Sequence, residues 1–168
     1  RSSRTRPRLR RMLEHGTTTV EVKTGYGLDT AAELRQWQAL ARLQTEGPWE
    51  IVPTFLGAHA VPADYAGRAD AYVDMVVNQM LPAMREESGA PHGPIFCDVF
   101  CDDGAFTVPQ ARRILEAARA RGFGVKIHAD EFVGLGATAL AVSYAVSGLA
   151  GFLAERCGGK IWIADLAT

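Results

Sequence analysis

The fold of this chain is indicated most clearly by the stretch IFCDVFCDDGAFTVPQARRILEAARARGFGVKI (residues 95–127). Its first seven residues form an apolar strand candidate, and its last five, FGVKI, form another. Between them, Thr107 and Gln110 have the spacing of a capping box, which predicts a helix that continues to Arg121 and stops at Gly122. A strand, a helix and a second strand in this order predict a βαβ unit of a parallel sheet.

The same pattern occurs twice earlier in the chain. TTTVEVK (17–23) predicts a strand, TGYGLD predicts a turn, and Thr30 with Glu33 predicts the capping box of a helix. EIVPTFLG (50–57) predicts another strand, followed by a loop and a long amphipathic helix that Pro82 should kink or end. Four successive strand-loop-helix units predict an α/β fold with a parallel sheet and right-handed crossovers.

Length and composition limit the architecture. The chain has 168 residues, of which 48% are hydrophobic and 22% are charged, and its formal net charge is -1. These proportions are those of a single globular domain and exclude a disordered chain, a collagen-like repeat and a disulfide scaffold. A complete (β/α)8 barrel needs about 200 to 250 residues. Two architectures therefore stay open, a self-contained flavodoxin-like doubly wound sheet and about four βα units of a TIM-type barrel.

The positive charge is concentrated at the start of the chain. Residues 1–11 contain six Arg and no acidic residue. Such a block is found in nucleic-acid-binding arms, but here no aromatic or second basic cluster accompanies it. Apolar Leu9, Met12 and Leu13 share the segment, so we interpret it as the solvated face of a helix over residues 8–15, with no nucleic-acid partner.

The cysteines and the longest uncharged segment indicate a cytoplasmic protein without a membrane partner. Cys97, Cys101 and Cys157 are an odd set with no second pair, which predicts buried thiols rather than disulfides or structural zinc. Phe132–Ala154 lacks charge, but its four Gly residues favour a buried small-residue helix, starting near Leu135, over a membrane span. No signal peptide pattern is present, and the first residue is Arg, so we expect the sequence to begin inside a longer reading frame.

Polar and ionisable residues follow every predicted strand, at the edge where α/β proteins place their chemistry. The residues at these strand exits are Lys23, Thr24, Tyr26, His59, Asp102, Asp103, His128, Asp130 and Glu131. A histidine beside two carboxylates is typical of a metal ligand with an acid/base partner, which makes the last three the strongest cluster. Spacing alone leaves a purely structural role equally open for Tyr26 and His59. Asp98 lies inside a strand and therefore requires a buried hydrogen-bond partner.

Four long motifs together resemble a known family. HGTTTVEVKTGYGLDT (15–30), VPTFLGAHAVP (52–62), FCDVFCDDGAFT (96–107) and KIHADEF (126–132) closely resemble imidazolonepropionase, a metal-dependent hydrolase of the amidohydrolase superfamily. The resemblance extends over about residues 8–142. It implies a (β/α)8 barrel, of which the four predicted strands would be the second to the fifth, so that this chain carries about half of the barrel.

The resemblance also implies an activity, which is hydrolysis of 4-imidazolone-5-propanoate to N-formimidoyl-L-glutamate in histidine degradation. In the family a zinc or iron ion activates the attacking water, and His128 matches a metal ligand. Glu131 matches a catalytic carboxylate that contacts the substrate and moves protons. His59 matches a histidine that contacts the substrate and polarises the attacked carbonyl, and Tyr26 matches a substrate-binding tyrosine. A full-length member of the family is expected to be a cytoplasmic homodimer.

The chain departs from the family at both ends. The family's HxH metal pair and a substrate-binding Arg would precede residue 1, and its metal-binding Asp would follow residue 168. We expect residues 1–168 to form a single α/β domain with a divergent tail at 143–168, produced by a gene fragment or a shifted reading frame. The isolated chain is then expected neither to bind zinc tightly nor to turn over substrate. The alternatives are a non-enzymatic α/β module that binds small molecules, and an assembly piece that needs a partner chain.

Overall fold

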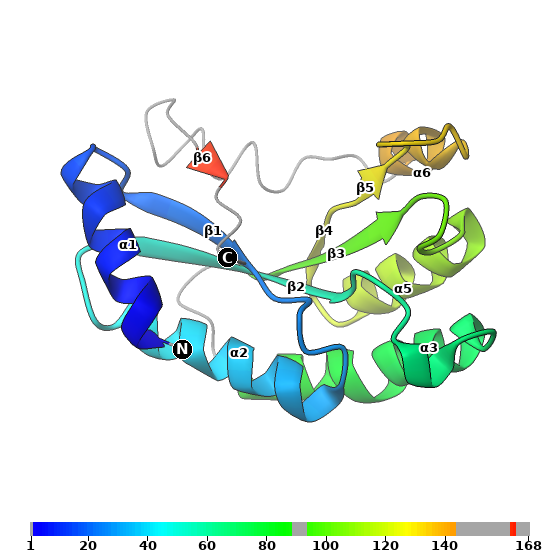
Figure 1. The fold of residues 1–168 in the computed structure, drawn as a ribbon, viewed down its shortest axis with the longest axis horizontal. Helices are drawn as coiled ribbons and strands as arrows, with labels where there is room; N and C mark the ends of the chain where they lie inside the picture. The colour runs from blue at the N-terminus through cyan, green and yellow to red at the C-terminus, as the bar shows by residue number, and fades with distance from the viewer. Residues whose placement is uncertain (1, 89–93, 144–161, 164–168) are drawn as a thin grey trace.

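A parallel β-sheet forms the centre of the structure, a computed structural model that describes residues 2–88, 94–143 and 162–163. The strands lie in the order β4-β3-β2-β1-β6, and β5 also pairs with β3 (Figure 1). They are β1 (Thr19–Lys23), β2 (Glu50–Ala58), β3 (Phe96–Cys101), β4 (Gly124–Val125), β5 (His128–Ala129) and β6 (Trp162–Ile163). The strand pairs all run parallel, which confirms the predicted parallel α/β sheet.

Helix α1 precedes the first strand and the other helices follow strands along the chain, and the main helices pack on one face of the sheet, below the strands in Figure 1. They are α1 (Ser2–Glu14), α2 (Thr30–Gln44), the 3-10 turn η1 (Ala63–Tyr65), α3 (Ala69–Met75), the π-helical segment η2 (Val76–Met80), α4 (Leu81–Glu87), α5 (Val108–Ala120) and α6 (Ala137–Ser143). The continuous segment α3–η2–α4 lies between the other two main helices, because α2 contacts η2 and α4, and α5 contacts α3 and η2.

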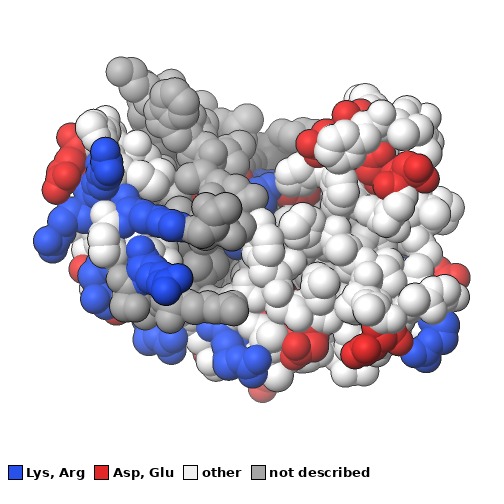
Figure 2. Space-filling model, viewed as in Figure 1, with Lys and Arg blue, Asp and Glu red and all other residues white. Residues whose placement is uncertain are grey.

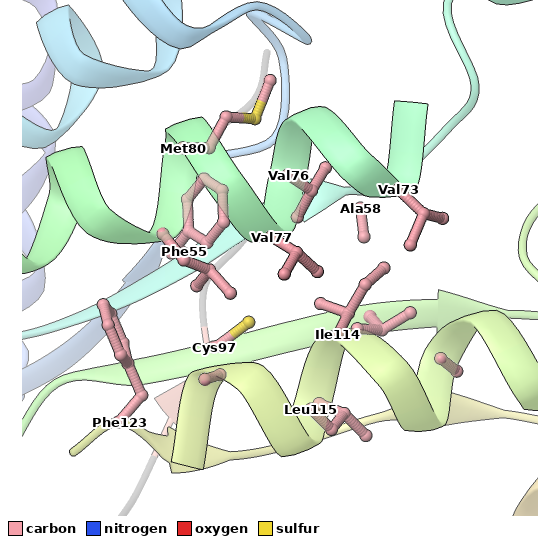
Figure 3. Close-up of a cluster of buried hydrophobic side chains, with 14 of the residues drawn as sticks. Phe55, Ala58, Val73, Val76, Val77, Met80, Cys97, Ile114, Leu115 and Phe123 are labelled. Atoms are coloured by element: carbon pink, nitrogen blue, oxygen red, sulfur yellow. The ribbon is translucent and has the colours of Figure 1, made fainter. Parts of the chain in front are cut away.

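The core lies between this helical layer and the sheet. Its larger cluster brings Phe55 of β2 against Met80 of η2 and Cys97 of β3 against helix α5 (Figure 3). A smaller cluster joins α1, β1 and α2 through Leu9, Val20 and other side chains. In β3, Cys97, Val99 and Cys101 belong to the core, so the alternate residues of the strand point to the opposite face. That opposite face carries the polar residues described below.

Several predicted elements are confirmed. The first three predicted strands are present, and α5 opens with the capping box formed by Thr107 and Gln110. Gly122 follows the end of α5 with a φ of 79°, in the left-handed region that a helix stop requires. The basic segment at the start is a helix whose arginines are exposed while Leu9 is 1% exposed, which confirms the predicted solvated face. Figure 2 shows this basic surface on the α1 side.

Other predicted elements differ in detail. Helix α1 begins at Ser2 rather than near residue 8, and an ion pair between Arg6 and Glu46 ties this extra turn to the end of α2. The N-cap of α2 is Asp29, whose side chain accepts a hydrogen bond from the Ala32 amide at 2.8 Å. The predicted capping box of Thr30 and Glu33 is therefore wrong. Glu33 turns instead toward the preceding loop.

The predicted strand over residues 123–127 and the predicted long helix are both interrupted. Two short strands, β4 and β5, replace the single strand, and both pair with β3. The helix changes to a π-helical segment over Val76–Met80, immediately before Pro82. Proline lacks the amide donor and collides with the carbonyl of the preceding turn, so the wider turn accommodates it without ending the helix.

The thiol and small-residue predictions are confirmed where the structure describes them. Cys97 and Cys101 are free and buried, and burial raises the pKa of the Cys97 thiol. Cys157 lies outside the described residues. Helix α6 confirms the start of the predicted small-residue helix, whose continuation past Ser143 is also outside them. Among the described helices, none combines the length and the apolarity that a bilayer crossing requires.

Tyr72 offers a test of the core. Its hydroxyl is buried and donates to the Gly57 carbonyl at 2.7 Å. Tyr72→Phe keeps the ring but leaves that carbonyl without its donor, so the free energy of unfolding should fall by about 1 kcal/mol in urea denaturation. Tyr65→Phe is the control, because its hydroxyl donates to the Met75 sulfur, a weak acceptor, at 3.5 Å. Equal losses in the two variants would contradict the assignment.

Candidate active site

The sheet face away from the main helical layer carries a connected set of buried charges. Lys23 Nζ lies 2.5 Å from Asp98 Oδ2, and His128 Nδ1 lies 3.0 Å from the same oxygen. Lys126 forms a short ion pair with Glu21, whose carboxylate also accepts the Thr54 hydroxyl. Asp98 and Glu21 are 1% and 2% exposed. Two carboxylates and two ammonium groups thus neutralise each other across β1, β3 and the β4–β5 junction, as a buried charge requires.

The proximity of these groups shifts their protonation. Burial alone would raise the pKa of Asp98, but its close contact with His128 and the charge of Lys23 hold that pKa below the usual value. The same contact raises the pKa of His128 against the effect of burial. Burial lowers the pKa of Lys126, although Glu21 opposes this shift. Asp98 is therefore an ionised carboxylate that faces two cationic or donor groups.

Three of the predicted site residues lie in one row at the carboxyl ends of the strands. The rings of Tyr26 and His59 meet edge to face, with centroids 5.3 Å apart. Phe100 of β3 continues the row, 6.2 Å from His59 and 6.3 Å from His128. The structure thus brings Tyr26 and His59 into contact, and it places His128 on the other side of the Phe100 ring. The strand-exit edge of the sheet is where the sequence predicted these residues.

Glu131, the fourth predicted residue, lies on the exposed loop that follows β5. Asp102, at the end of β3, holds this loop by accepting the amides of Phe132 at 2.7 Å and Val133 at 3.1 Å. The Phe132 amide is the main reason that the pKa of Asp102 is lowered. The loop that carries Glu131 is thus tied to the end of β3, and the charge of Glu131 contributes to the raised pKa of His128. Acidic side chains gather at this β5–α6 end of the molecule (Figure 2).

Two of the strand-exit carboxylates therefore hold loops in place through hydrogen bonds. Asp102 binds loop amides, and Asp130 accepts the amides of Leu135, Ala137 and Thr138. Hydrogen bonds, first of all from the Thr138 hydroxyl, lower the pKa of Asp130 to about 2. The oxygens of this pair are thus occupied by backbone donors of the two loops.

The described residues do not by themselves form a metal centre. Within residues 2–88, 94–143 and 162–163, no group of three or more His, Cys, Asp or Glu side chains is placed to hold a metal ion. His128 is a single candidate ligand, with Nδ1 turned to Asp98 and its side chain 41% exposed. A carboxylate at one ring nitrogen is the usual partner of a metal-binding histidine, because it orients the other nitrogen. Cys97 and Cys101 lie in the core.

One described cavity lies away from most of the site. It has a volume of about 970 Å³ between α1, the end of β1 and α2. Its described lining includes Arg8, Lys23, Tyr26 and Arg35. Tyr26 is thus the one predicted site residue that the described lining contains. The row from His59 to His128 lies instead on the open edge of the sheet.

Comparison with known proteins adds the evidence that geometry lacks. No family model matches the chain. The imidazolonepropionase of Herpetosiphon aurantiacus is 53% identical over 143 residues, which cover 83% of this chain and 34% of the relative. The Chloroflexus aggregans imidazolonepropionase is 56% identical over 141 residues, or 81% of this chain and 33% of the relative. The resemblance to imidazolonepropionases is confirmed. The chain spans about a third of the length of the curated imidazolonepropionases it matches.

Sequence reasoning missed part of the polar face that this imidazolonepropionase-like segment carries. Glu21 and Lys126 were not predicted to belong to a site, and Lys23 was named only as a strand exit. A usable signal exists, because Glu21 lies two residues before Lys23 and Lys126 lies two residues before His128. Ionisable residues at alternate positions of an apolar strand share one face of the sheet.

Removal of Asp98 should destabilise the fold. Asp98→Ala leaves the half-buried Lys23 ammonium without its closest counter-charge, so we expect a loss of about 3 kcal/mol in the free energy of unfolding. Asp74→Ala is the control, since it breaks the exposed pair with Arg113 and should cost less than about 1 kcal/mol. Urea denaturation measures both. Similar losses would show that the buried Asp98–Lys23 pair stabilises the fold no more than the exposed pair does.

Asp102 should govern the order of the loop that carries Glu131. Asp102→Asn replaces one accepting oxygen with an amide donor, so the Phe132 and Val133 amides should exchange with deuterium about tenfold faster. Asp103→Asn changes the exposed neighbour, to which neither of these two amides donates, and should leave both rates unchanged. Unchanged exchange in a folded Asp102→Asn variant would refute this role. Amide-resolved NMR exchange gives the measurement.

Proposed function

We propose that this chain carries part of the active site of an imidazolonepropionase, which hydrolyses 4-imidazolone-5-propanoate to N-formimidoyl-L-glutamate. The observation that carries the proposal is the row of Tyr26, His59 and His128 at the strand exits of a chain that is 53% identical to such an enzyme. A row of aromatic and imidazole rings beside an exposed carboxylate suits a flat, polar, five-membered ring. The substrate is then a small molecule.

We propose that the sheet is part of a TIM-type (β/α)8 barrel, with about four βα units. Two features support a barrel over a flavodoxin-like sheet. The strands β1 to β4 are neighbours in chain order, whereas a doubly wound sheet reverses its order at a switch point. The main helices share one face, whereas a doubly wound sheet has helices on both faces. Residues 1–168 stay predicted as one domain with a divergent tail at 143–168.

The roles of the site residues follow from the proposed reaction. His128 is assigned as a ligand of zinc or iron, an ion that supplies a nucleophilic water when bound, with its remaining ligands outside the described residues. Hydrolysis of a cyclic amide adds water across the ring C–N bond, so one proton must leave the water and one must reach the ring nitrogen. Glu131 is assigned to move that proton, and His59 and Tyr26 are assigned to contact the ring.

One observation favours further protein packing on this chain. Phe132 and Val142 are 74% and 76% exposed, and Val133 and Leu135 near them are also exposed. Apolar side chains gathered beside β5 and α6 are typical of a surface that other elements cover. This supports the assembly alternative as an aspect of the same proposal, in which further barrel units complete the site.

A chimera tests the proposal. The matching segment of the Herpetosiphon aurantiacus enzyme is replaced with the corresponding residues of this chain, and hydrolysis of 4-imidazolone-5-propanoate is followed by its ultraviolet absorbance. We expect turnover, because the segment would supply His59, His128 and Glu131 to a complete site. His128→Ala should abolish turnover and lower the bound metal, and Glu131→Gln should lower kcat by about 100-fold or more.

The control is His15→Ala, which removes an exposed histidine at the end of α1, far from the strand exits. It should leave turnover and metal content unchanged. A folded chimera that holds its metal but does not hydrolyse the substrate would refute the proposed function. Turnover that survives Glu131→Gln at full rate would refute the role of that carboxylate.

A further inference from the structure

Glu33 is a buried carboxylate that the reaction does not use. It lies in the first turn of α2 and is 0% exposed. Its oxygens accept the backbone amides of Gly25 at 2.9 Å, Gly27 at 2.6 Å and Leu28 at 3.1 Å. No Lys or Arg of residues 2–88 and 94–143 forms an ion pair with it. Its charge is therefore balanced by amide dipoles, which form an anion-binding concavity around it.

The loop that wraps Glu33 has two residues in an uncommon backbone conformation. Gly25 has a φ of 106° and Leu28 a φ of 56°, both in the left-handed region. A side chain at position 25 would place its Cβ 2.5 Å from the Leu56 carbonyl oxygen, so only glycine fits. A leucine with positive φ is strained by about 1 kcal/mol or more. The hydrogen bonds to Glu33 offset that strain and fix the loop backbone around the carboxylate.

The same loop determines how His59 is held. The Gly25 carbonyl lies 3.1 Å from His59 Nδ1, while the Gly25 amide donates to Glu33. A carbonyl oxygen only accepts hydrogen bonds, so Nδ1 must carry the proton. Neutral His59 then has its lone pair on Nε2. The Tyr26 and Phe100 rings on either side restrict rotation of the imidazole.

We propose that Glu33 is a positioning residue of the site, which acts through Gly25 to fix His59 in the Nδ1–H tautomer with Nε2 as a hydrogen-bond acceptor. In this form His59 accepts a hydrogen bond from a ring N–H or a water, and it polarises a carbonyl only as the imidazolium. The group it recognises is thus a donor of the cyclic amide class. The inference rests on the proposed function only in taking His59 to face the substrate.

The tautomer is measured directly, without turnover. Long-range 1H–15N spectra of the 168-residue chain, labelled at histidine, distinguish Nδ1–H from Nε2–H, and His59→Gln assigns the signal among the four histidines. At a pH where the ring is neutral, we expect His59 to show a single Nδ1–H pattern. A dominant Nε2–H pattern in the unmodified chain would overturn the proposal.

Glu33→Gln tests the link through Gly25. The glutamine presents an amide donor to amides that also donate, so the loop should relax and a mixture of His59 tautomers should appear. Asp29→Asn is the matched control: it also removes one negative charge at the start of α2, but its hydrogen bond goes to Ala32 of the helix. It should keep the single pattern. A folded Glu33→Gln variant with an unchanged tautomer would overturn the proposal.

A second variant covers the case in which Glu33→Gln does not fold. Glu33→Asp keeps the charge but withdraws the carboxylate by one methylene, and it should give the same mixture. In the chimera, Glu33→Gln should lower kcat by about 10-fold to 100-fold with a smaller effect on KM, because His59 is misaligned rather than absent. A fixed tautomer in an inactive chimera would refute the function and keep the positioning role. An active chimera in which His59 shows no preferred tautomer would keep the proposed function and refute the positioning role of Glu33.

Discussion

The polar face of the sheet depends on the buried carboxylate of Asp98. A parallel strand with helices on one face directs alternate side chains to the other, and in β3 that alternation places Asp98 away from solvent at 1% exposure. An isolated carboxylate in that place would be protonated. Lys23 and His128 keep Asp98 ionised. Glu21 and Lys126 form a second pair of opposite charges on the same face. Strand register, charge balance and the orientation of His128 therefore depend on one another.

Backbone amides, rather than further side-chain pairs, organise the loops at the strand exits. Glu33 accepts hydrogen bonds from backbone amides of the loop after β1, and Asp102 accepts them from the loop after β5. Asp130 closes the second loop onto α6. A carboxylate that accepts hydrogen bonds from several backbone amides restrains a loop through the main chain. Tyr26 and Glu131 lie on the two loops that are held in this way.

Local patterns predicted the elements well, and distant contacts account for what they missed. The α5 capping box is visible in sequence because Thr107 and Gln110 satisfy each other within one turn. The spacing of Thr30 and Glu33 is the same, yet Glu33 is drawn away by amides that precede the helix. Burial of Asp98 implied a partner, but Lys23, 75 residues away, is identified only by the fold. The resemblance named Tyr26, His59, His128 and Glu131, whereas the local pattern favoured only the cluster of His128, Asp130 and Glu131.

The hydrogen bond between His59 and Gly25 narrows the chemistry that this part of the site supports. A neutral imidazole with Nδ1–H directed at a carbonyl offers only an acceptor at Nε2, so a role in carbonyl polarisation requires the cation. His128 has the complementary arrangement, since its Nδ1 faces a carboxylate that stabilises positive charge on the ring. The two histidines are separated by Phe100 and held by opposite kinds of acceptor, a neutral carbonyl and an anion. Such different environments support the different roles that we propose for them, His59 as a contact for a ring donor and His128 as a ligand whose second nitrogen is oriented by Asp98.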